Sequence, residues 1–188
     1  MKQQLLKLIQ EFKPDCLQEQ IDQKNFLSYL YHFDDLLYRT NSLAHISSSP
    51  WIINKERTKV LMVYHNIYQS WSWCGGHADG NGNLLDVALK EAKEETGVKQ
   101  ITPLSSFPIA IDILPVPGHF KNDQYISSHV HLNVTYLCVV DESESLTIKP
   151  DENSGVKWIK IEDLENEVSE KEMLLVYQKL IKKTKKCA

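Results

Sequence analysis

Three glutamates in the middle of the chain have a spacing that suits metal binding. Glu91, Glu94 and Glu95 stand at i, i+3 and i+4, so on a helix they lie within an arc of roughly 100°. Like charges at these spacings repel one another by roughly a few tenths of a kcal/mol per pair. A bound cation would offset that repulsion, and Mg²⁺ takes oxygen ligands of this kind, often together with substrate phosphates. The chemistry would be activation of water and neutralisation of a leaving phosphate.

A glycine-rich loop, CGGHADGNGN, runs directly into the glutamates. Its four glycines, Gly75, Gly76, Gly80 and Gly82, allow the backbone to approach a ligand closely, and a carbonyl there could complete a coordination shell. Each signal is weak alone, because acidic helix faces are usually solvated and turns commonly contain Gly, Asn and Asp. Loop and glutamates together favour a metal site beside a phosphate site.

The pattern predicts a helix over residues 84 to 96 that carries the glutamates. Asn83 is a suitable N-cap, and Gly97 stands where a left-handed C-terminal residue belongs. Lys90 precedes Glu94 by four residues and is expected to pair with it. An apolar arc beside the acidic one should face the core: Leu85, Ala88, Leu89 and Ala92.

The flanking segments predict a mixed α/β (α+β) sandwich. A β-hairpin is expected where two strand-like segments, HISSSPWIIN and TKVLMVYHN, flank the turn-like NKER. Further strands are expected at 71–73, 107–116, 127–140 and 156–161. Helices are expected at 3–12, at 17–38 and after the capping-box pattern Ser169-Glu170-Lys171-Glu172. Central strands, one internal helix and helices at both ends indicate packed layers of helix and sheet.

Composition narrows the class of protein. The chain has 188 residues, 42% of them hydrophobic, and a net charge of −4. These values predict one domain, or one domain with an appendage, and no broad nucleic-acid surface. It contains no apolar run of about 18 residues that would span a membrane. The scattered Cys16, Cys74, Cys138 and Cys187 predict reduced thiols and a cytoplasmic location. The basic run at 182–186 is expected to be a solvated tail.

Residues 76 to 98 resemble the signature of the Nudix hydrolase family. That signature has Gly, five residues, Glu, seven residues, then Arg-Glu-apolar-x-Glu-Glu-x-Gly-apolar; here Gly76 opens it and KEAKEETGV closes it. Trp71 ahead of the double glycine is also typical. Three positions depart from the pattern: Gly82 replaces Glu, Lys90 replaces Arg, and Cys74 replaces a proline. Lysine still pairs with a carboxylate but lacks the bidentate fork, and the helix glutamates, which hold the metal in this family, are all present.

The resemblance implies a Nudix-type α/β/α sandwich with a mixed central sheet over residues 41–188 and an extra helical segment over 1–40, packed on the core. It further implies Mg²⁺, or Mn²⁺ in its place, and hydrolysis of a nucleoside diphosphate linked to another group. The implied metal ligands are Glu91, Glu94, Glu95 and the Gly75 carbonyl, and the catalytic set is Glu91, Glu94 and Lys90. The general base would be Glu91, Glu94 or a loop residue such as Glu152.

Candidate substrate-binding residues are Gly76, where the backbone can approach a ligand, and two histidines. His129, His131, Asn133 and Thr135 alternate along one predicted strand and share a face. That face is either exposed to solvent or a wall where imidazoles donate hydrogen bonds to phosphate or base, more strongly when protonated. His45, His77 and His119 are isolated in sequence, and surface or satisfied positions are expected for each.

Two other functions stay open at this level. Gly82 in place of Glu keeps open a non-catalytic Nudix-like domain that senses a nucleotide, although the intact glutamates argue against it. An isomerase or base-repair enzyme of the same fold has no support outside the signature. The expected partner is a small nucleotide-type diphosphate, with no nucleic-acid polymer and no membrane; a homodimer is neither predicted nor excluded.

Overall fold

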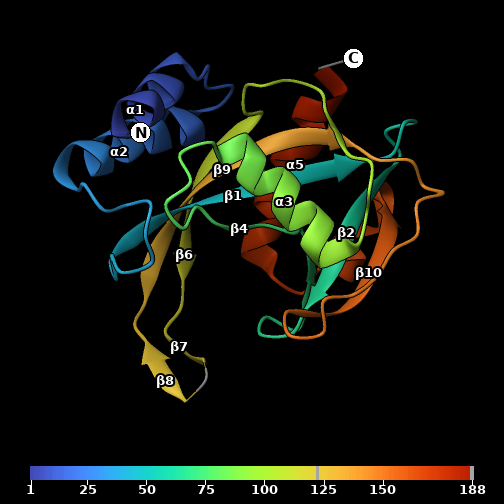
Figure 1. The fold of residues 1–188 in the computed structure, drawn as a ribbon. Coiled ribbons are helices and arrows are strands. Elements are labelled where there is room, and N and C mark those ends of the chain that lie inside the picture. Colours follow the sequence, from blue (N-terminus) through green and yellow to red (C-terminus); the bar gives the residue numbers. More distant parts are fainter. Residues whose placement is uncertain (122, 187–188) are drawn as a thin grey trace.

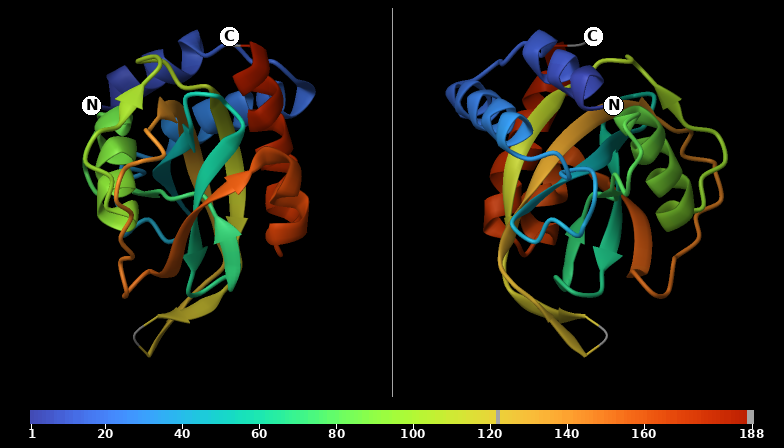
Figure 2. Two further views of the ribbon diagram at one scale, coloured as in Figure 1. Left: turned by 90° about the vertical axis from the view of Figure 1, so that its right-hand side faces the viewer. Right: turned by 60° about the vertical axis from the view of Figure 1, so that its left-hand side comes forward.

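The computed structural model describes residues 1–121 and 123–186. An eight-stranded mixed sheet forms its centre, with the main path β10-β2-β1-β9-β5 and with β3 on β2, β4 on β1 and β6 on β9. Figure 1 and Figure 2 show helix α3 (Leu84–Thr96) on one side of this sheet and α5 (Lys171–Lys186) on the other. The predicted fold class, a sandwich with a mixed central sheet, is confirmed.

Parallel pairing of β1 (Ala44–Ile53) with β9 (His129–Val139) organises the sheet. It runs from Ala44 opposite Val130 to Ile53 opposite Val139. The predicted hairpin is also present, because β1 pairs antiparallel with β2 (Lys59–His65). The short β4 (Gly76–His77) pairs with β1, and β6 (Ala110–Val116) pairs with β9. Segments far apart in the sequence therefore lie side by side.

The remaining strands differ somewhat from the predicted spans. They are β3 (Ser70–Ser72), β5 (Thr102–Pro103) and β10 (Asn153–Lys160). The segment between β6 and β9 forms an additional small hairpin of β7 (His119–Lys121) and β8 (Gln124–Ile126), which projects from the body in Figure 1. No strand pattern in the sequence had indicated this hairpin.

Helix α3 has the predicted bounds and the predicted ends. The Asn83 side chain accepts a hydrogen bond from the Asp86 amide at its start, and Gly97 adopts a left-handed conformation, φ 76°, at its end. The other helices are α1 (Lys2–Glu11), α2 (Leu17–His32), the 3-10 turn η1 (Ile161–Asp163) and α4 (Leu164–Glu167). The prediction that α2 reaches residue 38 is wrong: Phe33 is extended, and Leu36 and Leu37 are buried from a turn.

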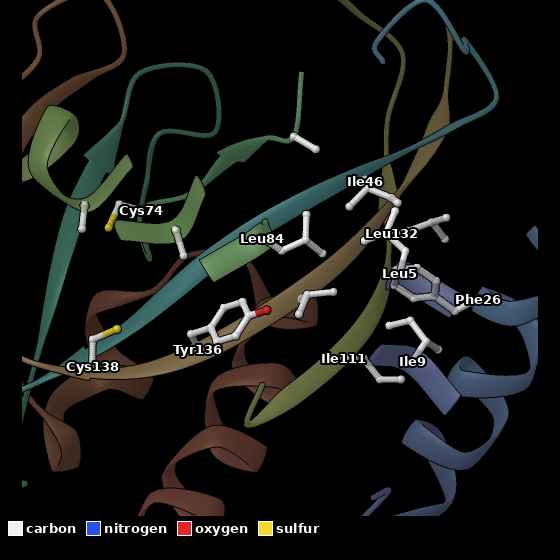
Figure 3. Close-up of a cluster of buried hydrophobic side chains, with 14 of the residues drawn as sticks. Leu5, Ile9, Phe26, Ile46, Cys74, Leu84, Ile111, Leu132, Tyr136 and Cys138 are labelled. Atoms are coloured by element: carbon white, nitrogen blue, oxygen red, sulfur yellow. The ribbon is translucent and has the colours of Figure 1, made fainter. Parts of the chain in front are cut away.

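Two hydrophobic clusters fill the two faces of the sheet, because successive side chains of a strand point to opposite faces. Ile46 and Leu132 pack with Leu84 of α3 and with Ile9 and Phe26 of the N-terminal helices (Figure 3). The second cluster lies toward α5 and contains Trp51, Met62, Leu137, Tyr177 and Leu180. The N-terminal helices thus share the core of the sheet; the division of the chain at residue 40 stays a prediction.

Buried ion pairs join α2 to α5 and β6. Glu19 is fully buried, and its Oε2 lies 2.7 Å from Lys183 Nζ. Lys179 pairs with both Glu19 and Asp112. The expectation that the run 182–186 is a solvated tail is therefore wrong at Lys183, which is only 7% exposed because the last turns of α5 pack beside α2.

Two further expectations concern the chain as a whole. Within the described part of the chain, no helix has the length and apolar character to cross a membrane. Cys16, Cys74 and Cys138 are free thiols, and Cys187 lies outside the described residues.

Candidate active site

The double glycine lets the backbone lie directly against the side chains of α3. A Cβ atom on Gly76 would stand 2.3 Å from Glu91 Cδ, and one on Gly75 would stand 2.3 Å from Ser49 Oγ. Neither position has room for a side chain. The Gly75 amide donates a hydrogen bond of 2.8 Å to Glu95 Oε1. The loop and the helix are thus in direct contact, with Glu95 against the backbone of Gly75 and Glu91 against that of Gly76.

Three carboxylates converge at this point. Oxygens of Glu91, Glu95 and Glu152 lie within 4.8 Å of one another. Glu152 comes from the loop before β10, and two backbone hydrogen bonds hold it there: its carbonyl accepts from Asn66 and its amide donates to Lys149. The buried Asn153 side chain also donates to the Glu95 backbone carbonyl, 3.0 Å away. From the sequence, Glu152 was expected only as a general base.

The electrostatics of this group suit a cation. Glu95 is 3% exposed, and burial raises its pKa to about 8, although the hydrogen bond from Gly75 acts in the opposite direction. Burial also raises the pKa of Glu91, with Lys90 lowering it and Glu94 raising it further. A cation would compensate for these poorly solvated carboxylates. The oxygen ligands and the close backbone approach therefore fit Mg²⁺.

Glu94 pairs with lysines beside the converging carboxylates. Its oxygens lie 3.5 Å from Lys90 Nζ and 3.6 Å from Lys149 Nζ, so the predicted pair of Lys90 and Glu94 is present. Lys149 also lies 2.9 Å from Glu152 Oε2. Among the described residues, Glu94 belongs to no group of three converging ligands. Its role as a metal ligand, and that of the Gly75 carbonyl, stay predictions.

The predicted polar face of β9 is buried at Asn133 and Thr135 and partly exposed at His129 and His131. Asn133 Oδ1 accepts hydrogen bonds from Ser47 and Ser49 at 3.0 Å each. His129 and His131 are close together, with their Nε2 atoms 3.3 Å apart.

His45 and His77, for which surface or satisfied positions were expected, lie close to the two histidines of β9. The β1–β9 register places His45 opposite His131, and β4 brings His77 opposite Ser47. His77 Nε2 lies 3.2 Å from His131 Nε2. The four residues His45, His77, His129 and His131 are called the histidine cluster below. The strand pairing that creates it has no signal in the sequence.

Burial changes what His131 can do. Desolvation, reinforced by His77, His45 and His129, lowers the pKa of His131 to about 2. His131 is therefore neutral at physiological pH. A neutral imidazole still offers one hydrogen-bond donor, so the contribution of His131, like that of His129 and Gly76, to a substrate site stays a prediction.

Comparison with known proteins agrees with this geometry. The NUDIX domain family matches residues 45–180. A Nudix hydrolase from Mycobacterium smegmatis, RenU, has a similar fold with 14% identity, covering 76% of this chain and 86% of its own, with a TM-score of 0.57. A NUDIX-family hydrolase from Clostridium perfringens has 22% identity, coverages of 72% and 95%, and a TM-score of 0.50. No curated protein matches the sequence.

The family match covers most of the chain and includes every residue of the candidate site. The chain belongs to the Nudix family. It is accordingly a hydrolase of pyrophosphate bonds, and the departures at Gly82, Lys90 and Cys74 leave the converging carboxylates intact.

Proposed function

We propose that this protein hydrolyses a nucleoside diphosphate linked to another group, in a reaction that depends on Mg²⁺ held by Glu91 and Glu95, with Glu152 beside the ion. The observation that carries the proposal is the convergence of these carboxylates beside Gly75 and Gly76. When bound, Mg²⁺ would neutralise charge on the pyrophosphate oxygens and polarise the attacking water. Mn²⁺ offers the same preference for oxygen ligands and is expected to substitute.

The chain's own residues would position the reactants. The Gly75 amide holds one oxygen of Glu95, which leaves the other free to act as a ligand. Gly76 leaves space for Glu91 and allows a phosphate to come close to the backbone. Each of these contacts depends on the absence of a side chain, so the glycines contribute to the orientation of both the carboxylates and the substrate.

Glu152 is the residue best placed to remove a proton from water. Its side chain is 39% exposed, and Lys149 Nζ orients one of its oxygens at 2.9 Å. Glu95 is buried and bound to Gly75, so it is a poorer choice for a group that must reach incoming water. Glu91 and Glu94 stay alternatives for the base, because the family resemblance implies that the base can come either from the helix or from a loop.

The substrate needs direct measurement, because specificity depends on pocket walls rather than on the fold. One structure of similar fold is a Caenorhabditis elegans Ap4A hydrolase, 16% identical, covering 72% of this chain and 93% of its own, with a TM-score of 0.50. Dinucleoside polyphosphates therefore enter the test panel with nucleotide sugars, ADP-ribose, oxidised nucleoside triphosphates and CDP-alcohols. A small-molecule substrate stays a prediction from the family resemblance, and a cytoplasmic location stays a prediction from composition.

The test is a screen of purified protein against this panel with Mg²⁺ and with EDTA, followed by identification of the products. Hydrolysis in ¹⁸O-labelled water shows which phosphorus is attacked. On the best substrate, Glu152→Gln should lower kcat by at least about 100-fold with little change in KM. The exposed Glu165 in α4 provides the control variant, Glu165→Gln, which should match wild type. Full turnover in EDTA would overturn the proposal.

A further inference from the structure

The histidine cluster lies outside the carboxylate site and has a geometry of its own. One imidazole comes from β1, one from β4 and two from β9. His131 Nε2 lies 3.2 Å from His77 Nε2 and 3.3 Å from His129 Nε2. The ring of His45 stands 4.7 to 4.9 Å from each of the other three rings, measured between centroids. The ring of His45 thus contacts the other three, and the ligand atoms of His45, His77 and His131 form one close group.

Backbone carbonyls fix the orientation of two of the four rings. His45 Nδ1 lies 3.1 Å from the Asn41 carbonyl, and His129 Nδ1 lies 2.8 Å from the Ser127 carbonyl. Because a carbonyl only accepts, each Nδ1 carries the proton and each neutral ring presents a lone pair at Nε2. His45 is 5% exposed, and its Nε2 has no hydrogen-bond partner.

His131 has the opposite problem. Its Nε2 faces two other ring nitrogens at hydrogen-bonding distance, but a ring nitrogen offers only one in-plane proton or lone pair. At most one of the two contacts is therefore a well-formed hydrogen bond. A buried polar atom without a partner is destabilising. In this cluster His45 Nε2 has no hydrogen-bond partner, and His131 Nε2 has two neighbouring nitrogens but can form a good hydrogen bond with only one.

A tetrahedral metal ion removes both problems. Two nitrogens, each about 2.0–2.1 Å from a tetrahedral Zn²⁺, are roughly 3.3 Å apart. The distances from His131 Nε2 to the Nε2 atoms of His77 and His129, 3.2 and 3.3 Å, match this separation between two ligand atoms. The ligand atoms of His45, His77 and His131 all lie within 4.8 Å of one another. The Asn41 and Ser127 carbonyls accept hydrogen bonds from Nδ1 of His45 and His129. Hydrogen bonds of this kind commonly orient histidines that bind a metal through the other ring nitrogen.

We propose that the histidine cluster binds one Zn²⁺ ion, with His45, His77 and His131 as ligands and His129 as the fourth. All four donors are imidazole nitrogens, which suit Zn²⁺, whereas Mg²⁺ prefers the oxygens of Glu91 and Glu95. A site with four protein ligands has no open position, so its role is structural. It would tie β4 to β1 and β9, next to Gly76, and thereby hold the backbone against which Glu91 packs.

The test uses full-length protein without an affinity tag, stripped of metal and then titrated with Zn²⁺ in excess Mg²⁺, so that the carboxylates are already occupied. One equivalent should bind and raise Tm by about 8 °C or more at a thousandfold excess over Kd. Co²⁺ in the same titration should develop the visible absorption of a tetrahedral complex. X-ray absorption should show nitrogen ligands at about 2.0–2.1 Å from the Zn²⁺.

Variants assign the binding to these residues. His45→Gln combined with His131→Gln should lower Zn²⁺ affinity by at least about 100-fold, more than loss of an outer partner. His32→Gln, at an exposed position of α2, is the matched control and should bind as wild type. Glu95→Gln should also retain Zn²⁺, so failure of this proposal is distinguishable from failure of the Mg²⁺ proposal.

Two outcomes would overturn the zinc site: no binding of one equivalent by the wild-type protein, or unchanged affinity in the double variant. Should the double variant fail to fold, X-ray absorption on the wild-type protein decides the question. Oxygen ligands in that spectrum would place the ion elsewhere, while four nitrogens would place it at the cluster.

Discussion

Replacing Glu95 with glutamine should have opposite effects on stability and on activity. Glu95 is 3% exposed, and its pKa is about 8 rather than the ordinary 4.5. At about 1.4 kcal/mol per pH unit, ionising this carboxyl in the metal-free folded protein costs up to about 5 kcal/mol more than in the unfolded chain. Glutamine cannot ionise, yet its Oε1 can still accept the hydrogen bond from Gly75.

The direction follows from proton binding. Between pH 4.5 and 8 the unfolded chain has released this proton while the folded protein retains it. Low pH therefore favours folding, and the contribution of Glu95 is lost as pH rises toward 8. The metal-free Glu95→Gln variant should not lose stability in this way as pH rises, because glutamine does not ionise. At pH 8 it should be more stable than wild type by up to about 5 kcal/mol, or roughly 10–20 °C in Tm.

The assay is thermal and urea unfolding in EDTA at pH 5 and pH 8. Glu94→Gln serves as the control, because Glu94 is partly exposed and paired with lysines, and should keep the wild-type pH dependence. Added Mg²⁺ should raise Tm of wild type at pH 8 but not that of Glu95→Gln. On a confirmed substrate the variant should lose at least about 100-fold in kcat. If its metal-free stability falls with pH as steeply as that of wild type, the reasoning about Glu95 is refuted.

Three further substitutions test the loop and the packing. Gly76→Ala places a Cβ 2.3 Å from Glu91 Cδ and should lower kcat at least about tenfold while circular dichroism shows an intact fold; unchanged turnover would contradict the close approach. The Cβ of Gly82→Glu would have the flexible Met1 side chain as its nearest neighbour, 3.2 Å away, so kcat should change by less than about fivefold. A large gain would indicate that the natural chain is a weakened enzyme or a sensor. Lys183→Met leaves Glu19 with one lysine fewer and should cost about 3 kcal/mol in urea unfolding, whereas the exposed Lys185→Met should cost almost nothing.

The features predicted correctly from sequence are those that depend on neighbours along the chain. The bounds of α3, its Asn83 cap and its Gly97 end follow from periodicity and capping chemistry within about 15 residues. The pairing of Lys90 with Glu94 follows from one helical turn. The signature from Gly76 to Val98 is contiguous, so the order of residues along the chain is enough to indicate the family and, with it, the fold.

Other features depend on which strands and helices become neighbours, and those needed the tertiary structure. Glu152 reaches Glu95 because Asn153 anchors its loop to α3 from a position 58 residues away. The histidine cluster exists because parallel β1–β9 pairing places His45 opposite His131, with β4 supplying His77. Lys183 is buried because α2 packs beside α5. Periodicity shows which face a residue occupies, but strand register and helix docking result from packing over the whole chain, so the partners across the sheet could not be predicted from local sequence.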